Sequence, residues 1–229
     1  VINLGTMAVD GSFTLAPNGA GAVTIVNDAG LTLAESTMGG AFSGTDTTGN
    51  ITDSGALTIN GTTTLVTSAD DGTIVLDVTT HAFAGALTIT TNDSSGTDAD
   101  VTIDGGTTAL IIAASTIDGD LSLRSGNSSG ITDTGTVTVG GNASLTTDDN
   151  AGVINLGTMA VDGSFTLAPN GAGAVTIVNV AGLTLRASTT VGVFRGSATT
   201  RNITDSGALA ITGTTTIVNS AYARTIVPH

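Results

Sequence analysis

Short segments of alternating apolar and hydroxyl-bearing side chains recur along the whole chain. In segments 31–33, 57–59, 87–89 and 101–103, a Thr stands between two aliphatic residues. Successive side chains of a β-strand point to opposite faces of a sheet, so each segment predicts a strand with one buried and one exposed side. The residues expected to point inward are Leu31, Leu33, Leu57, Ile59, Ile74, Leu87, Ile89, Val101 and Ile103. Those expected to point outward are Thr32, Thr58, Thr88 and Thr102.

The spacing of these strand segments favours a solenoid. They follow one another at short intervals, separated mostly by Gly, Asn or Asp, which accept tight corners. No window has the apolar spacing of an amphipathic helix, so helix should be almost absent. An antiparallel sandwich would also give this spacing. Strands of three to five residues and only six aromatic side chains, five Phe and Tyr222, instead favour thin stacked layers of Val, Ile and Leu.

The chain repeats itself at two scales. Residues 1–27 return unchanged as residues 153–179, and residues 1–77 align with 153–229 at 58 of 77 positions. A fainter repeat begins with Ile-Thr-Asp at Ile51, Ile131 and Ile203, so the long period of 152 divides into units of 80 and 72. A solenoid lengthens by copying coils because each coil contacts only its neighbours. We therefore expect one continuous β-solenoid over residues 1–229.

Composition excludes several classes of function. The chain has no Lys, five Arg, 18 Asp and one Glu, and its net charge is −14. Nucleic-acid binding needs basic groups that displace counterions, and an anionic bilayer would repel this surface. Without Cys there is no disulfide framework, thiolate metal site or thiol nucleophile. No apolar run is long enough to span a membrane, and no signal peptide opens the sequence. The chain begins inside one repeat and stops inside another, so we expect it to be a piece of a longer protein.

Two segments carry a family resemblance: GNITDSGALTINGTTTLVTSADDGTIVL (49–76) and GNASLTTDDNAGVINLGTMAVDGSFTL (141–167). They resemble the repeat regions of filamentous haemagglutinin-like adhesins and related large autotransporter adhesins, which are bacterial exoproteins. The resemblance covers essentially the whole chain and implies a right-handed parallel β-helix at the cell surface. With about 20 to 25 residues per coil, the chain would make about ten coils and a rod on the order of 50 Å long. The resemblance supplies no site residue, and the secretion domain, membrane barrel and anchor motif of the family are missing from this sequence.

Acidic residues are the first candidates for chemistry, because paired carboxylates can cleave sugars or bind Ca²⁺. The pairs follow matching strand segments, and in the last repeat Tyr222 and Ala223 replace one of them. We therefore interpret them as solvated corner residues. The acidic candidates are the pair Asp70 and Asp71, the pair Asp148 and Asp149, and the run Asp93, Asp98, Asp100 and Asp104.

Basic candidates are fewer. A polysaccharide lyase typically needs a basic residue to abstract a proton, yet no Lys or Arg precedes Arg124, which stands alone until Arg186. His81 is the only internal His, and with no second His near it we predict a turn residue rather than a base or ligand.

Pairs of Thr could order water on an ice-binding face if they recurred in every coil. Such pairs occur at Thr88 with Thr90 and at Thr136 with Thr138. We expect the intervening segments 102–104 and 122–124, which carry Asp104 and Arg124, to interrupt the array.

The second repeat loses acidic residues and gains Arg. Residues 1–77 carry a charge of −8 and residues 153–229 a charge of +2, with His counted as neutral. The replaced positions are Asp28, Glu35, Asp46, Asp70, Asp71 and Asp77, which become Val180, Ala187, Ala198, Tyr222, Ala223 and His229. The added basic residues are Arg186, Arg195, Arg201 and Arg224. No physical argument from the sequence alone explains this change.

The sequence as a whole predicts a structural protein rather than an enzyme. We expect a shaft segment of a secreted bacterial adhesin, located at the cell surface, with no catalytic, cofactor-binding or metal-binding residue. Its partners should exclude nucleic acid and an inserted membrane. Host glycans or proteins would bind through regions outside this sequence, and copies could associate end to end or side by side. The alternatives are a carbohydrate-active β-helix enzyme and a self-assembling filament or sheath protomer.

Overall fold

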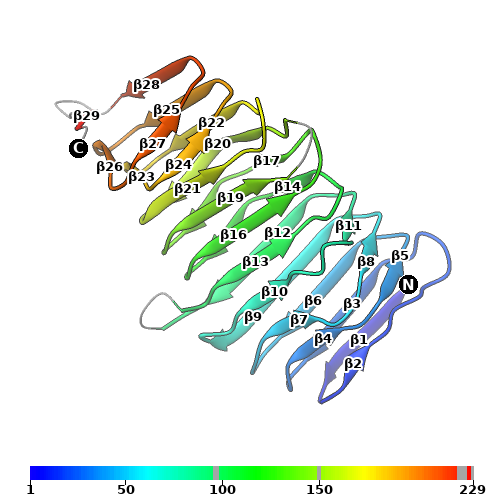
Figure 1. Ribbon diagram of the computed structural model, residues 1–229. Helices are drawn as coiled ribbons and strands as arrows, with labels where there is room; N and C mark the ends of the chain where they lie inside the picture. The colour runs from blue at the N-terminus through cyan, green and yellow to red at the C-terminus, as the bar shows by residue number, and fades with distance from the viewer. Residues whose placement is uncertain (95–97, 149–150, 221–225, 228–229) are drawn as a thin grey trace.

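The computed structural model describes residues 1–94, 98–148, 151–220 and 226–227. These residues wind into a parallel β-solenoid of about ten turns, with the two chain ends at opposite ends of the stack (Figure 1). Every strand pair is parallel, and no helix occurs among the described residues, so none is available there to cross a membrane. The predicted all-β solenoid is confirmed.

Two long sheets run the length of the rod. The first sheet, hereafter the 13-stranded sheet, contains β1 (Ile2–Met7), β3 (Val23–Asn27), β6 (Phe42–Asp46), β9 (Thr63–Asp70), β12 (Leu87–Asn92), β14 (Leu110–Ile112), β17 (Ile131–Asp133), β20 (Ile154–Val161), β22 (Val175–Asn179), β25 (Phe194–Ala198) and β28 (Thr215–Asn219), with β15 (Ser115–Ile117) and β18 (Val137–Val139) beside this path. The second, 11-stranded sheet contains β2 (Ser12–Phe13), β4 (Leu31–Leu33), β7 (Ile51–Asp53), β10 (Ile74–Leu76), β13 (Val101–Asp104), β16 (Leu121–Ser125), β19 (Ala143–Thr147), β21 (Ser164–Ala168), β23 (Leu183–Leu185), β26 (Ile203–Asp205) and β29 (Ile226–Val227).

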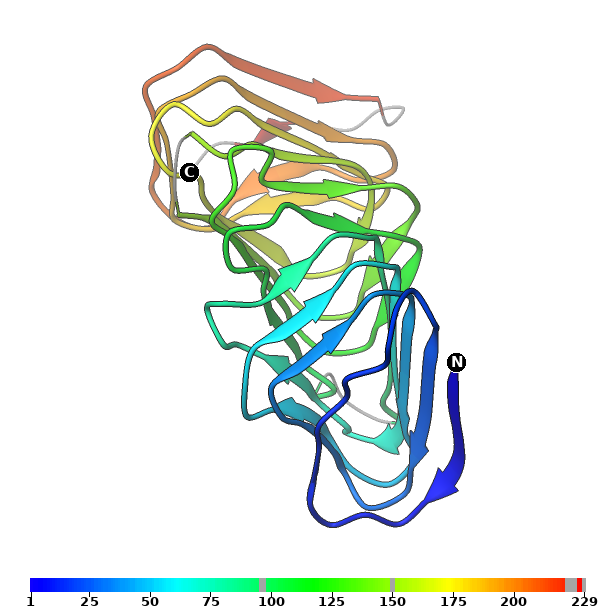
Figure 2. The same cartoon turned by 90° about the vertical axis from the view of Figure 1, so that its right-hand side faces the viewer.

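Short strands form a third, interrupted face of the rod (Figure 2). One group contains β5 (Ser36–Met38), β8 (Leu57–Ile59) and β11 (Ala82–Phe83), and a second contains β24 (Ser188–Thr190) and β27 (Leu209–Ile211). A typical coil therefore passes from the 13-stranded sheet to the 11-stranded sheet and then to this third face.

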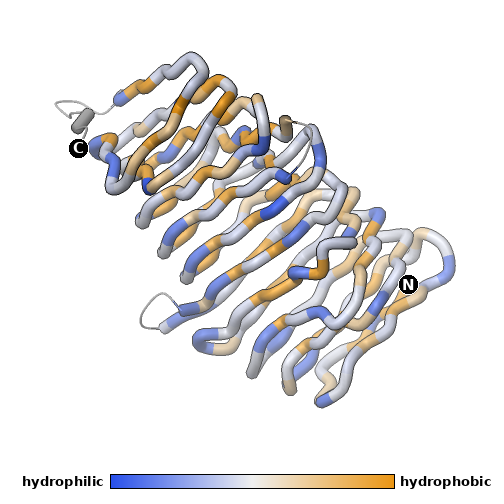
Figure 3. Tube along the Cα trace, in the orientation of Figure 1, coloured by the Kyte–Doolittle hydropathy of each residue, from blue (hydrophilic) through white to orange (hydrophobic). Residues whose placement is uncertain are grey.

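The core is a column of aliphatic side chains inside the coils. All nine residues predicted to point inward are at most 1% exposed, whereas Thr32, Thr58, Thr88 and Thr102 lie partly exposed on the outer face. Hydrophobic residues follow the strands and hydrophilic residues gather where the coils turn (Figure 3). Each fully buried aliphatic side chain contributes about 1.5–3 kcal/mol. The largest fully buried side chains are Phe42, Phe83, Phe165 and Phe194. The predicted inward and outward faces are confirmed.

Side-chain caps join each coil to the next. Asp133 of the Ile-Thr-Asp phrase accepts hydrogen bonds from the backbone N–H groups of Gly157 (2.9 Å) and Thr158 (2.7 Å), one coil further on. Asp53 in the first Ile-Thr-Asp phrase faces the backbone N–H groups of Asp77 and Val78 in the same way, at 3.3 Å each. The repeated Asp thus satisfies backbone donors at a corner, where no strand partner is present.

The long repeat places equivalent strands on the same face of the rod, whereas the fainter repeat does not. Strands β1 to β10 correspond in order to β20 to β29, and corresponding strands lie on corresponding faces of the rod. The fainter repeat, whose first step runs from Ile51 to Ile131, does not keep its face. Strand β7 lies in the 11-stranded sheet, but β17, with the same Ile-Thr-Asp phrase, lies in the 13-stranded sheet. The cause is the segment between β13 and β14, where the chain returns to the 13-stranded sheet without a strand on the third face.

Candidate functional site

Three carboxylates from two successive coils meet at one corner of the rod. Asp70 ends β9, Asp71 follows it in the turn, and Asp93 follows β12. One oxygen of each lies within 4.8 Å of the others. The pairing of Asn92 with Asp70 stacks the two corners directly on one another. We call Asp70, Asp71 and Asp93 the acidic corner.

The turn after β9 shapes this corner. Thr67 donates a hydrogen bond from Oγ1 to the carbonyl of Gly72 at 3.0 Å, which closes the turn. Asp71 adopts a φ of 58°, in the left-handed region that Asp tolerates better than most residues. The turn thereby directs adjacent carboxylates outward, toward the next coil.

The carboxyl groups of the acidic corner are electrostatically unequal. Ser94 donates to Asp70 from its backbone N–H (2.6 Å) and its hydroxyl (2.8 Å), and these bonds lower the pKa of Asp70. The pKa of Asp71 is raised, first by a hydrogen bond with Asp93 and then by desolvation and the charges of neighbouring carboxylates. Protonation of Asp71, or a cation beside it, would relieve this repulsion.

The acidic corner offers oxygen ligands of the kind that Ca²⁺ takes. The sequence put Asp70 and Asp71 in one group and Asp93 in another, and stacking of coils brings the two groups together. Of the rest of the predicted acidic run, Asp98 adjoins this corner, because its backbone N–H donates to Asp93 Oδ2 at 3.3 Å and its charge helps to raise the pKa of Asp71. Asp100 and Asp104 do not converge on it. Asp100 Oδ1 accepts a hydrogen bond from the backbone of Asp120 at 2.7 Å, and Asp104 faces Arg124.

The turn that carries Asp148 is the same turn one repeat later. Thr147 donates to the carbonyl of Gly152 at 3.0 Å, as Thr67 does to Gly72, and Ala151 has a φ of 57°. Ala151 therefore takes the place of Asp71, and Asp148 precedes it by three positions. Asp148 therefore lies on the equivalent turn but not at the position of Asp70 or Asp71. Five residues singled out in the sequence lie outside the described residues, namely Asp149, Tyr222, Ala223, Arg224 and His229.

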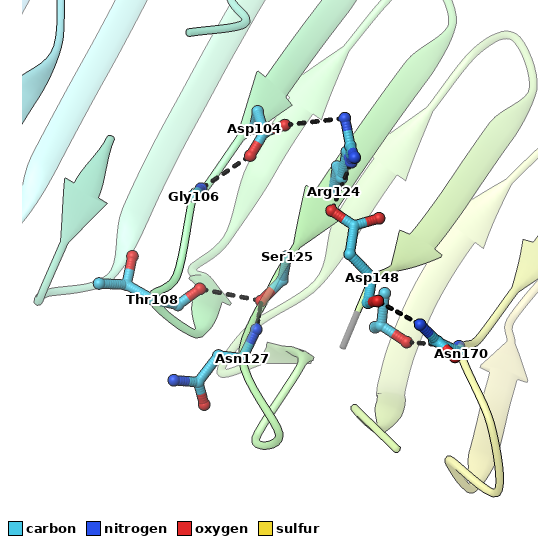
Figure 4. A network of polar contacts seen from close by, with 9 residues as sticks. Asp104, Gly106, Thr108, Arg124, Ser125, Asn127, Asp148 and Asn170 are labelled. Carbon is cyan, nitrogen blue, oxygen red and sulfur yellow. Dashed lines mark hydrogen bonds and ion pairs between the residues drawn. The ribbon is translucent and has the colours of Figure 1, made fainter. Parts of the chain in front are cut away.

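Arg124 links three coils on the outer face of the rod (Figure 4). Its Nε lies 2.5 Å from Asp148 Oδ2, and its guanidinium also lies 3.5 Å from Asp104 Oδ2. The Arg124 side chain is 50% exposed, so these pairs contribute about 0–1 kcal/mol each. Asp104 accepts from the backbone of Gly106 at 2.7 Å. This Arg is occupied by carboxylates rather than presented as a base.

His81 lies in the loop before β11, and its side chain is buried. Its Nδ1 accepts a hydrogen bond from the Leu57 backbone N–H at 2.9 Å, so the proton of the neutral ring is assigned to Nε2. Nε2 lies 2.9 Å from Asp53 Oδ2 without the alignment of a straight hydrogen bond. Burial lowers the pKa of His81, against the opposing effect of the Asp53 charge. With both side chains at most 1% exposed, the pair has no access to a substrate.

The Thr pairs lie on a different sheet from the residues expected to interrupt them. Thr88 and Thr90 belong to β12 of the 13-stranded sheet, whereas segments 102–104 and 122–124 belong to the 11-stranded sheet. That expected interruption was therefore wrong. The array still fails to recur, because the pairing partners of Thr88 and Thr90 in β9 are Thr64 and Val66.

One shallow depression lies on the outer face of the 11-stranded sheet. It has a volume of about 280 Å³ and extends over β13, β16, β19 and β21. Its polar lining includes Asp100, Asp120, Asn142 and Arg186. Asp120 Oδ1 accepts from the backbone of Asn142 at 2.6 Å, so these carboxylates also serve as caps between coils.

Comparison with known proteins identifies a repeat family. A family described as repeats of unknown function (DUF5649) matches residues 20–90, 98–159 and 172–226. Each matched segment covers about three coils and contains one Ile-Thr-Asp phrase, at Ile51, Ile131 and Ile203 in turn. The family repeat therefore corresponds to the fainter repeat with steps of 80 and 72 residues, and not to the long period of 152. No curated protein and no solved structure matches the chain.

Proposed function

We propose a structural role for this chain, which belongs to the family of repeats of unknown function (DUF5649). In this role it forms the shaft segment of a secreted bacterial surface protein. The observation that carries the proposal is the unbroken parallel pairing of the 11-stranded sheet from β2 to β29. Eleven strands at about 4.8 Å spacing form a rod about 50 Å long. Such a rod holds whatever follows it at a fixed distance from whatever precedes it.

Stiffness follows from the way the coils are joined. Each coil is bound to the next by backbone hydrogen bonds on two or three faces and by side-chain caps such as Asp133. Bending the rod would have to open several of these bonds together. The resemblance of the Ile-Thr-Asp-Ser-Gly phrases to haemagglutinin-like adhesins supports placing this shaft on a bacterial cell surface, where it would present a distal binding region.

A distance measurement between the rod ends tests the role as a shaft. The chain has no Cys, so Asp10→Cys with Thr216→Cys places one spin label on an exposed residue near each end. We expect a narrow distance distribution in pulsed electron resonance, while a Gly-Ser linker of the same length gives a broad one. A broad distribution for the folded chain would refute the stiff shaft. Accessibility of the segment to protease on intact cells of its source tests the surface location separately.

The carbohydrate-active alternative has its own test, because the depression holds Asp100 and Asp120 beside Arg186. We expect no release of reducing or unsaturated ends from acidic glycans, with or without Ca²⁺. A surface of net charge −14 repels such substrates. Reproducible activity that is lost in Asp120→Ala but retained in Asp10→Ala, a change at an exposed acid in another coil, would replace the structural role with an enzymatic one.

A further inference from the structure

The third face of the rod stops at β11. Strands β5, β8 and β11 pair in that order, and among the described residues no strand pairs with β11 on the side of the next coil. The turn of residues 105–109, which leads from β13 to β14, lies there instead. Pairing in the 13-stranded sheet is also sparse at this level, because β12 meets β14 at Leu87 with Ile112 and meets β15 at Thr90 with Thr116. Local opening is expected where backbone pairing is sparse.

This turn packs closely against β11 and the residue before it. Gly106 lies against the backbone of His81, where an added Cβ would collide with the His81 carbonyl oxygen. Thr108 Oγ1 accepts a hydrogen bond from the Phe83 N–H at 3.1 Å, where a strand partner would otherwise accept it. The coil above holds the turn in place, because Ser125 Oγ donates to the Thr108 carbonyl at 2.8 Å (Figure 4). The turn therefore covers the open edge of the third face.

His81 is held from its other side by the preceding coil. Its Nδ1 accepts from the Leu57 N–H at 2.9 Å, and its Nε2 lies 2.9 Å from Asp53 Oδ2. The ring is fully buried and lies beside the ring of Phe83, with the two centroids 5.4 Å apart. His81 thus connects three coils, namely its own, the preceding coil and the coil that carries the turn. Its ring can reach water only if this part of the third face opens.

We propose that His81 and the turn that covers it form a latch, which closes the third face at neutral pH and opens in mild acid. The latch consists of His81, Phe83, Gly106 and Thr108. A proton taken up from solvent adds a hydrogen to Nδ1 of His81, and this hydrogen then faces the Leu57 N–H, so that two donors oppose one another. The charged ring finds an acceptor for this hydrogen in water once the latch has opened.

Burial and the surrounding charges act on His81 in opposite directions. Three carboxylates, those of Asp53 in β7, Asp77 beyond β10 and Asp104 in β13, favour the charged ring. Arg124, 3.5 Å from Asp104, offsets part of this attraction. Burial outweighs the carboxylates and lowers the pKa of His81, whereas an exposed His titrates near pH 6.5. As the pH falls below about 6.5, the open form therefore binds a proton that the closed form excludes, and opening is favoured.

Opening of the latch leaves the rest of the rod in place. Strand β9 stays paired with β12, and β10 stays paired with β13, on the two faces away from the latch. The coils at this level are then joined on two faces instead of three, so the rod bends here more easily than elsewhere. The latch is thus an acid-sensitive joint in an otherwise stiff rod. Because it is part of the fold, its test is independent of the proposed role as a shaft.

Hydrogen exchange of backbone amides tests the latch in the full chain. The reporter amides are Leu57, which donates to His81, and Phe83, which donates to Thr108. Their protection factors, corrected for the intrinsic effect of pH on exchange, should fall between pH 7 and pH 5 by up to about tenfold per pH unit, the limit for uptake of one proton. The amides of β22 should stay more strongly protected than the reporters at both pH values. Equal protection of the reporters and β22 at pH 5 would mean that the chain opens as a whole, and would overturn the latch.

Two variants separate protonation from packing. His81→Met places at this corner the residue that Met159 supplies at the equivalent one, and it should remove the pH dependence of Phe83 protection. Thr108→Ala removes the acceptor of the Phe83 N–H, so it should lower the protection of Leu57 by a similar factor at both pH values and leave the pH dependence intact. Reporter protection in the parent chain that is unchanged or higher in acid would refute the latch, as would an equal fall in His81→Met.

Discussion

Asn27 and Asn179, which hold the same position in the two long repeats, make the same buried hydrogen bonds. Oδ1 of Asn27 accepts from the backbone of Val9 at 2.9 Å, and Oδ1 of Asn179 accepts from Val161 at 2.8 Å. Each amide also donates to the carbonyl of its Val partner, at 3.0 and 2.9 Å, and to the carbonyl of a Gly three residues on. Both side chains are fully buried. The chain therefore has the same local structure at both places, and the segment between them is a complete period.

The equivalence of Asn27 and Asn179 predicts that the rod can be lengthened without a new junction. Inserting a second copy of residues 28–179 after Asn179 recreates a junction already present in the chain. From β3 to β22 the 13-stranded sheet takes seven steps, so the rod should lengthen by about 34 Å. Small-angle scattering measures the length, and circular dichroism should show unchanged strand content per residue. An insertion ten residues shorter does not match the repeat period, so this variant should misfold. If the two insertion variants had the same length and the same strand content per residue, the proposed equivalence of Asn27 and Asn179 would be wrong.

Sequence periodicity predicted the fold well, and stacking explains where it failed. Alternation within 57–59 identified the buried and exposed sides because a strand has a period of two residues. Alternation does not show which sheet a strand joins or which strand of the next coil it pairs with. That neighbour depends on the number of residues in each corner, which varies from coil to coil. For this reason the convergence of Asp71 with Asp93, and the placing of Thr88 and Asp104 on separate sheets, were out of reach of the sequence pattern.

The inward face of β8 predicts a large difference between adjacent substitutions. Ile59 is fully buried, so Ile59→Asp places an unpaired carboxylate in the aliphatic core and should cost several kcal/mol of unfolding free energy. Thr58→Asp, one residue earlier on the outer face, should change it by less than about 1 kcal/mol. Denaturant titration measures both. Similar losses for the two variants would contradict the assigned faces.

The repeated Asp of the Ile-Thr-Asp phrase should stabilise the joint between coils. Asp133 accepts from two backbone N–H groups and from the Thr158 hydroxyl, the last at 2.6 Å. Asp133→Ala leaves these donors to water and should cost about 1–3 kcal/mol of unfolding free energy. Asp133→Asn keeps one acceptor oxygen and should lose less. If Asp133→Ala and Asp133→Asn have the same unfolding free energy as the parent chain in denaturant titration, the cap contributes nothing to stability.

The acidic corner should limit stability at neutral pH. Asp71 has a raised pKa in the folded chain, so the native state takes up a proton at higher pH than the unfolded chain and is favoured as pH falls through that value. At pH 7 the carboxylates of Asp71 and Asp93 repel one another. Asp71→Asn removes the repulsion and tolerates the positive φ, so it should raise the melting temperature at pH 7. The gain should shrink toward pH 4, and Asp10→Asn, outside the corner, should not reproduce it.

His81 should make the rod less stable in mild acid. Its pKa is lowered in the folded chain, chiefly by burial, whereas the unfolded His titrates near pH 6.5. Below about pH 6.5 the unfolded chain therefore binds a proton that the native state excludes, and the unfolding free energy falls as pH drops toward the folded pKa. Protonation of Nδ1 would also remove the acceptor of the Leu57 N–H, while the charges of Asp53, Asp77 and Asp104 oppose part of the loss.

Exchange of His81 with its structural counterpart isolates this effect. His81 precedes Ala82, the partner of Thr58, just as Met159 precedes Ala160, the partner of Thr138. His81→Met should therefore fit the core and flatten the decline in unfolding free energy between pH 7 and pH 5. Met159→His, beside the equivalent Asp133, should steepen it. Denaturant titrations at both pH values give the slopes. Because the carboxylates elsewhere are common to all three chains, parallel slopes for the parent and both variants would show that this buried pair has no part in the acid response.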